Sequence, residues 1–179
     1  MKLILPSILS ILLLNLISFG QTQSNDVSSD SHDKIVRVTV VLNCSADQAF
    51  RYFTENDLLT KWLTAKADVE LKEGGKYELF WTPQDTDLTN NSTFGCKVLS
   101  FERPYYLNVE WRGNANHKDF MNNVRPLTNV TVVFHELNDK STKVTLLHTG
   151  WRQDKNWEEA REFFINAWKG AFKQLEEIL

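Results

Sequence analysis

The chain contains few of the residues that form cross-links, tight turns and metal sites. Its 179 residues include only two cysteines, four histidines, seven glycines and four prolines. So few glycines and prolines exclude a collagen-like or low-complexity chain, and two cysteines cannot build a disulfide framework. Cys44 and Cys96 could form a single disulfide bond, or each could fill a position suited to a small apolar residue. The sequence leaves both possibilities open.

The chain also lacks an excess of positive charge. Its formal net charge is −3. The only charged residue in segment 1–20 is Lys2, so the rest of the chain has 19 basic and 23 acidic residues and a net charge of −4. Nucleic acids and anionic lipid surfaces attract proteins through clustered Lys and Arg. We therefore expect neither as a partner.

No set of metal ligands or catalytic residues can be recognised. Across a turn at 138–140, His135 should face Lys143 or Val144. His148 lies about four residues further along its strand, roughly 13 Å away, so the two histidines cannot share a metal ion directly. The chain has no Gly-rich phosphate loop and no G-x-S-x-G motif. Glu110 alternates with apolar residues and should face solvent. We predict no metal, no cofactor and no catalytic activity.

A hydrophobic run near the N-terminus predicts export. Lys2 precedes the mainly apolar segment 3–19, and the small residues Ser18 and Gly20 mark a cleavage site before Gln21. This pattern is typical of a secretory signal peptide over residues 1–20. The alternative is a membrane anchor, but the run is about the minimum length for a span, contains Pro6 and Asn15, and has no basic stop segment after it. We expect a secreted or periplasmic protein without a stable membrane anchor after cleavage, with a disordered leader over 21–33.

Residues 34–179 predict one α+β domain. Ile35–Leu42 alternates as a strand, and Ser45 and Asn56 can begin two short helices. Six more alternating segments follow, joined by short connections that favour antiparallel pairing. They are Ala65–Leu71, Tyr77–Trp81, Thr93–Phe101, Tyr106–Arg112, Val130–Leu137 and Thr142–Thr149.

One long aromatic helix ends the chain. Apolar residues recur at helical period from Trp157 to Leu179, and Asn156 with Glu159 forms a capping-box signal. A stripe this wide must be buried, and the preceding strands supply a sheet to cover it. We therefore expect a helix-grip fold, in which a curved, seven-stranded antiparallel sheet packs against the long helix.

Short motifs along residues 35–179 support this architecture. In order, they are A-x-x-A-F at 46–50, K-W at 61–62, G-G-K-Y at 74–77, F-x-R-P at 101–104, L-x-x-E-W at 107–111, H-T-G-W at 148–151 and A-W-x-x-x-F-x-x-L at 167–175. Together they resemble the family of activator of heat-shock protein 90 ATPase homologues, within the START-like and birch-pollen-allergen-like (SRPBCC) superfamily. The resemblance implies a helix-grip domain and a protein partner.

Aromatic residues from separate elements form the candidate site. A helix-grip fold would bring together Trp62, Trp81, Trp111, Trp151, Phe164 and Trp168. They could line a cavity for a small apolar or amphipathic ligand, or fill a solid core. The long polar segment Gly113–Pro126 would lie at the mouth of such a cavity. The two function classes that remain are a ligand-binding module and a protein-interaction domain related to co-chaperones.

Overall fold

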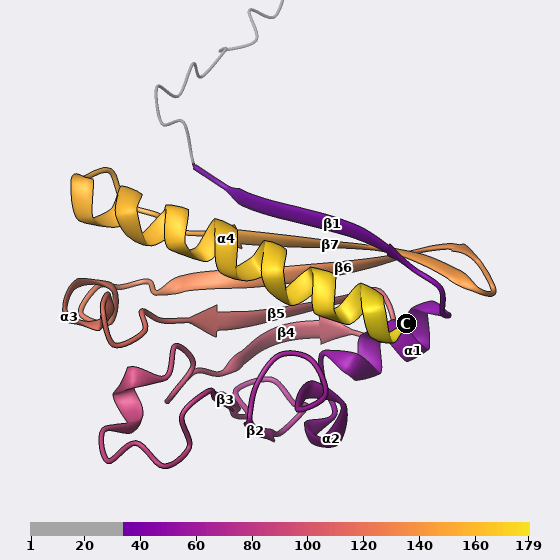
Figure 1. The fold of residues 1–179 in the computed structure, drawn as a ribbon, viewed down its shortest axis with the longest axis horizontal. Coiled ribbons are helices and arrows are strands. Elements are labelled where there is room, and N and C mark those ends of the chain that lie inside the picture. The colour runs from indigo at the N-terminus through magenta and orange to yellow at the C-terminus, as the bar shows by residue number, and fades with distance from the viewer. Residues whose placement is uncertain (1–33) are drawn as a thin grey trace, which may run out of the picture. The chain divides into compact units, whose positions relative to one another are not determined.

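The computed structural model describes residues 34–179. The predicted signal peptide and leader lie outside the described residues. The seven strands are β1 (Val36–Leu42), β2 (Lys66–Val69), β3 (Tyr77–Phe80), β4 (Val98–Glu102), β5 (Tyr106–Trp111), β6 (Thr128–Asn138) and β7 (Ser141–Thr149). All pairings are antiparallel. The long helix α4 (Lys155–Ile178) lies across the sheet (Figure 1).

The prediction of a single seven-stranded sheet is wrong in its grouping, although the number of strands is right. Five strands form one sheet in the order β1-β7-β6-β5-β4, and β2 pairs with β3 in a second sheet. An isolated bridge between Lys76 and Lys97 joins the two. The side chain of Thr93 stops the ladder from continuing: its hydroxyl accepts from Leu79 N at 2.6 Å and donates to Leu79 O at 3.1 Å. These two backbone groups are therefore unavailable to a strand partner.

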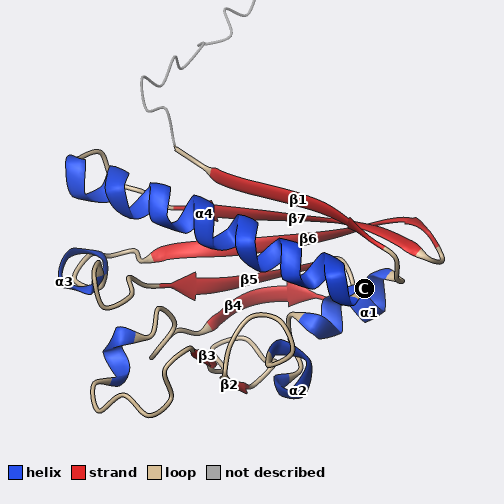
Figure 2. Cartoon of the chain, viewed as in Figure 1, coloured by secondary structure: helices blue, strands red, loops and turns tan. Residues whose placement is uncertain are grey.

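The alternation of side chains places the core between the large sheet and α4. Along β5, Leu107, Val109 and Trp111 are buried, and Glu110 lies on the opposite face, as expected. There the Glu110 carboxylate accepts from Lys97 N at 3.2 Å. His135 pairs with Lys143, which confirms the predicted register of the last hairpin. Figure 2 shows α4 as a separate layer over the strands.

The helix ends differ in part from the sequence signals. Ser45 caps α1 (Ala46–Tyr52) as predicted, with its hydroxyl accepting from Gln48 N. The residue that caps α4 is Asp154 rather than Asn156, because the Asp154 carboxylate accepts from Trp157 N at 3.0 Å. Asn56 does not cap α2 (Asn56–Leu59) either; its side chain accepts from Val69 N and so ties α2 to β2.

Two short helices occur where the sequence indicated only loops. These are the 3-10 helix η1 (Leu88–Asn90) and α3 (Lys118–Met121), which lies inside the long segment 113–126. Met121 from α3 is buried in the core. Both cysteines are buried and free, so Cys44 and Cys96 form no disulfide bond. Within residues 34–179, no helix is long and apolar enough to cross a membrane.

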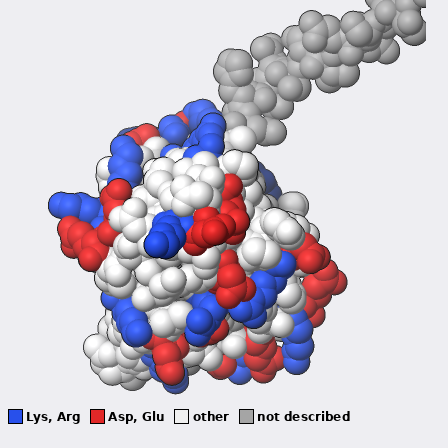
Figure 3. Space-filling model, turned by 90° about the vertical axis from the view of Figure 1, so that its right-hand side faces the viewer, with Lys and Arg blue, Asp and Glu red and all other residues white. Residues whose placement is uncertain are grey.

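Charged side chains of both signs are interspersed on the face of the domain seen in Figure 3. That face has no extended area of positive charge, which is the electrostatic signature of a surface that binds nucleic acid.

Candidate ligand-binding site

A cavity of about 570 Å³ lies between α4, the end of β5 and three loops. This volume lies within the range of small-molecule sites in proteins. The apolar part of its lining consists of Trp62, Leu63, Trp81, Trp111, Ala115, Phe163, Phe164, Ala167, Trp168, Gly170 and Ala171. The polar part consists of Thr82, Asn90, Asn91, Ser92, Asn114, Asn166 and Gln174.

Five of the six predicted aromatic residues line this cavity. Trp111 and Trp168 meet at the cavity wall, with ring centroids 4.8 Å apart. Trp81 lies 6.2 Å from Trp111 and is 40% exposed, so it forms part of the rim. Trp62 closes one end, where its indole N–H donates to the backbone carbonyl of Tyr52. Their role in binding a ligand stays a prediction.

Trp151 is the sixth predicted residue, and the structure places it outside this cavity. It packs against His148, with ring centroids 4.5 Å apart, and its indole N–H donates to the His148 carbonyl at 2.9 Å. Trp151 therefore packs against a residue behind the cavity wall and does not itself line the cavity. Phe164 packs against both Trp151 and His148, so it is a core residue as well as a lining residue.

A buried histidine anchors the cavity wall. The indole Nε1 of Trp168 donates to Nδ1 of His148 at 3.3 Å. His148 Nε2 lies 3.1 Å from the Thr128 hydroxyl, which itself donates to the Trp111 carbonyl at 2.9 Å. Because Trp168 donates to Nδ1, that nitrogen carries no hydrogen. The Thr128 hydroxyl uses its hydrogen on the Trp111 carbonyl, so it accepts from Nε2. His148 therefore carries its single ring proton on Nε2 and is neutral. Complete burial lowers the pKa of His148 to about 3.

The indole N–H of Trp111 differs from those of Trp62, Trp151 and Trp168, which all have hydrogen-bond partners. It is buried and has no hydrogen-bond partner among the described residues. An unpaired buried donor costs about 1–3 kcal/mol, so a donor of this kind usually finds a partner. Trp111 is also a lining residue of the cavity.

α4 presents two different stripes to its surroundings. Phe164, Trp168, Phe172 and Leu175 are buried in the core. The adjacent stripe lines the cavity with small residues, Ala167, Gly170 and Ala171, and begins at Phe163, which is 41% exposed. A Cβ atom added at Gly170 would meet nothing within 4 Å, so the cavity extends to the helix backbone there. The sequence pattern showed one wide apolar stripe and did not reveal this division.

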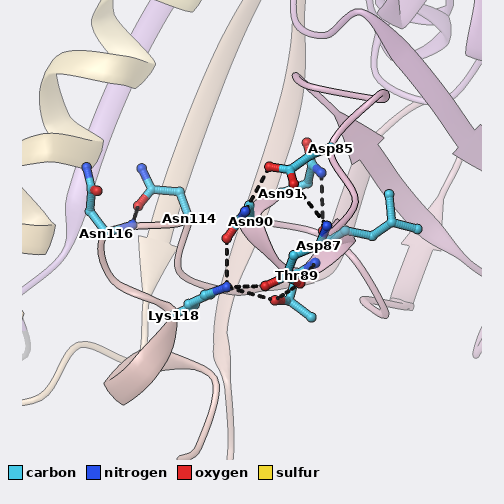
Figure 4. A network of polar contacts seen from close by, with 9 residues as sticks. Asp85, Asp87, Thr89, Asn90, Asn91, Asn114, Asn116 and Lys118 are labelled. Atoms are coloured by element: carbon cyan, nitrogen blue, oxygen red, sulfur yellow. Dashed lines mark hydrogen bonds and ion pairs between the residues drawn. The ribbon is translucent and has the colours of Figure 1, made fainter.

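Lys118 connects the two loops at the mouth of the cavity. Its ammonium group lies 2.5 Å from an oxygen of Asp87, 3.2 Å from Thr89 Oγ1 and 2.7 Å from Asn90 Oδ1 (Figure 4). Asn90 also donates to Asp85 at 2.8 Å. We call these five residues the Lys118 network. The hydrogen bond from Lys118 is the main reason that the pKa of Asp87 falls to about 2.

The second of these loops folds back tightly at Gly113. A Cβ atom there would lie 2.6 Å from the backbone carbon of His117, so only glycine fits. The Gly113 N–H donates to Asn122 Oδ1 at 2.9 Å. The fold places Asn114 and Ala115 at the cavity, which agrees with the expected position of segment 113–126 at its mouth.

The polar lining residues were not identified from the sequence. The polar lining residues carry only amide or hydroxyl side chains, and the lining contains no Asp, Glu, Lys, Arg or His. The amides come from three separate segments, so no local motif marked them. The one available signal was Gly170, because glycine is unfavourable inside a helix. Within residues 34–179, no group of three or more His, Cys, Asp or Glu side chains is placed to bind a metal ion.

A sheet that packs against one long C-terminal helix, with a cavity between them, defines a helix-grip protein. The family model "Activator of Hsp90 ATPase homolog 1-like protein" matches residues 43–179, so the chain belongs to this family. No curated protein matches the chain.

Solved structures share the fold. An HSP90 activator from Plasmodium falciparum is 23% identical, with a TM-score of 0.61 over 80% of this chain and 94% of its own. A protein from Mesorhizobium loti is 22% identical, with a TM-score of 0.63 over 80% and 95%. The Aha1 dimer from Colwellia psychrerythraea is 14% identical, with a TM-score of 0.62 over 82% and 96%.

Proposed function

We propose that this protein is an exported, non-catalytic carrier or sensor that binds a small apolar or amphipathic ligand between α4 and the sheet. The observation that supports this most strongly is the cavity of about 570 Å³, in which Trp81, Trp111 and Trp168 provide aromatic surface and amides lie nearby. Such a combination of apolar walls and a few polar groups is typical of small-molecule sites.

Titration with an uncharged, environment-sensitive dye such as N-phenyl-1-naphthylamine tests this proposal. The expected result is saturable dye emission together with quenching of tryptophan fluorescence, since four tryptophans line the cavity. Gly170→Trp is the matched variant, because its side chain would occupy the cavity without removing any core group. Equal dye binding by Gly170→Trp and by the unaltered protein would show that the dye binds elsewhere.

A protein-interaction function is the second candidate, and family membership favours it. The P. falciparum relative is described as an HSP90 activator. If this chain acted in the same way, adding residues 34–179 to a purified heat-shock protein 90 would raise its ATPase rate. An exported protein would not meet that partner, so under our proposal the ATPase rate stays at its basal value.

A further inference from the structure

We propose that the cavity takes an uncharged molecule with a flat ring system and a hydrogen-bonding group at each end, and that it excludes carboxylates and ammonium ions. The inference rests on the proposed function, since it defines the ligand class of the same cavity. It follows from the charge, the shape and the spacing of the lining residues.

The lining of the cavity carries no charged side chain. Eighteen residues line the cavity, and none of them is charged. A charged group that leaves water needs an opposite charge or several strong hydrogen bonds, and otherwise its burial is far more costly than that of a neutral hydroxyl. The walls therefore offer no opposite charge to an anion or a cation that leaves water to lie among them.

Lys118 and Arg112, two cations near the lining, already bond other residues of the protein. Lys118 is bound to Asp87, Thr89 and Asn90 at the mouth. Arg112 comes directly after β5 and donates from one terminal nitrogen to the Phe94 carbonyl at 3.0 Å, while its Nε has no partner among the described residues. Lys118 cannot pair with a ligand carboxylate without losing its present partners, and Arg112 does not line the cavity.

The shape of the cavity favours a flat body. On the helix side, Ala167, Gly170 and Ala171 leave the backbone accessible. On the opposite side lie the rings of Trp81 and Trp111. A ring system can stack on these indoles and still pass the helix at Gly170, because no side chain protrudes there.

The spacing of two amides defines the ends. Asn166, Gly170 and Gln174 follow one another at intervals of four residues, so they lie on one line along α4. Asn166 and Gln174 are about 12 Å apart along the helix axis. Both residues are exposed to solvent, and both line the cavity. Each can therefore donate to, or accept from, one end of a ligand centred on Gly170.

A matched series of pyrenes tests the proposal by quenching of tryptophan fluorescence. The probes share one ring system and carry, at both ends of the long axis, either hydroxymethyl, carboxylate, aminomethyl or methyl groups. The hydroxymethyl probe should bind saturably. The carboxylate and aminomethyl probes should bind at least about tenfold more weakly, and the methyl probe should fall between these limits.

Variants on α4 locate the binding. Gly170→Leu should reduce affinity for the hydroxymethyl probe at least about tenfold without lowering the melting temperature, because leucine favours a helix more than glycine does. Lys169→Leu is the matched control, since Lys169 is exposed and does not line the cavity. Asn166→Leu and Gln174→Leu should each lower the affinity for the hydroxymethyl probe about fivefold and leave the affinity for the methyl probe unchanged.

The outcomes separate this inference from the proposed function. The inference would be overturned if a charged probe bound as tightly as the hydroxymethyl probe or more tightly. It would also be overturned if Asn166→Leu and Gln174→Leu left the affinity for the hydroxymethyl probe unchanged. In both cases the proposal of a ligand-binding cavity would stand. Binding of N-phenyl-1-naphthylamine without any pyrene would overturn the flat-ring class alone. Failure of every probe, the dye included, would overturn both proposals.

Discussion

The indole nitrogen of Trp168 lies 3.3 Å from Nδ1 of the fully buried His148, and so α4 is hydrogen-bonded to the C-terminal end of β7. Both residues are neutral in this arrangement. A second proton on His148 would place its Nδ1–H directly against the Trp168 N–H, with two donors facing each other.

The stability of the domain should therefore depend on the protonation of His148. Burial lowers its pKa from 6.5 to about 3 in the folded protein. The unfolded chain takes up this proton below about pH 6.5, while the folded domain does so only near pH 3. Stability is therefore lost as the pH falls through that window, by on the order of 4–5 kcal/mol. Urea unfolding measured at several pH values checks this.

His148→Asn should flatten the acid side of that profile while lowering stability near pH 7. His135→Asn, at an exposed position of β6, is the control and should leave the profile unchanged. A His148→Asn variant with the same acid slope as the unaltered protein would show that other groups cause the loss.

Trp168→Ala should destabilise the domain by about 3–5 kcal/mol, because the side chain is 4% exposed and also bonds His148. Phe163→Ala, on the same helix but 41% exposed, should cost less than about 1 kcal/mol. Equilibrium urea unfolding of both variants measures the contrast. Similar losses for the two would contradict the division of α4 into a core stripe and a cavity stripe.

Lys118→Met should loosen the loops at the cavity mouth without unfolding the domain. The lysine contacts Asp87, Thr89 and Asn90 across the gap between η1 and α3. Amide hydrogen exchange should accelerate in segments 82–92 and 113–122, while the sheet stays protected. Lys155→Met, whose ion pair with Glu159 is exposed, is the matched control and should change neither segment. Unaltered exchange in Lys118→Met would mean that the backbone alone fixes these loops.

Export should leave a mature chain that begins at or near Gln21. The basis is the short basic start, the apolar segment 3–19 and the small residues before Gln21. N-terminal sequencing of protein from the host's extracytoplasmic fraction measures this. A chain that retains Met1 and occurs only in the cytoplasm would refute export.

The sequence was sufficient to predict the number and order of the strands, the register of the last hairpin and the long helix, because these follow from side-chain periodicity. It placed the start of the fourth strand at Thr93, whereas β4 begins at Val98. It did not predict the break between the two sheets, which depends on one hydroxyl, that of Thr93, bonding Leu79 from a segment 14 residues away. It also misplaced the cap of α4, since Asp154 and Asn156 are both residues that can begin a helix.

The candidate site was predictable only in its aromatic part. Large aromatic residues must be buried somewhere, and a helix-grip fold directs most of them to one place. The distinction between Trp111, at the cavity, and Trp151, behind it, depends on the packing of His148 between elements. The amides of Asn90, Asn114 and Asn166 come from three segments, and only the folded chain brings them together.

Native mass spectrometry of the protein purified gently from its own host is the most direct test of the central claim, that the cavity binds a small molecule. We expect a population heavier than the bare chain by one small uncharged molecule, absent from Gly170→Trp purified in the same way. A bare mass in both preparations, together with no saturable binding of the dye, would contradict it.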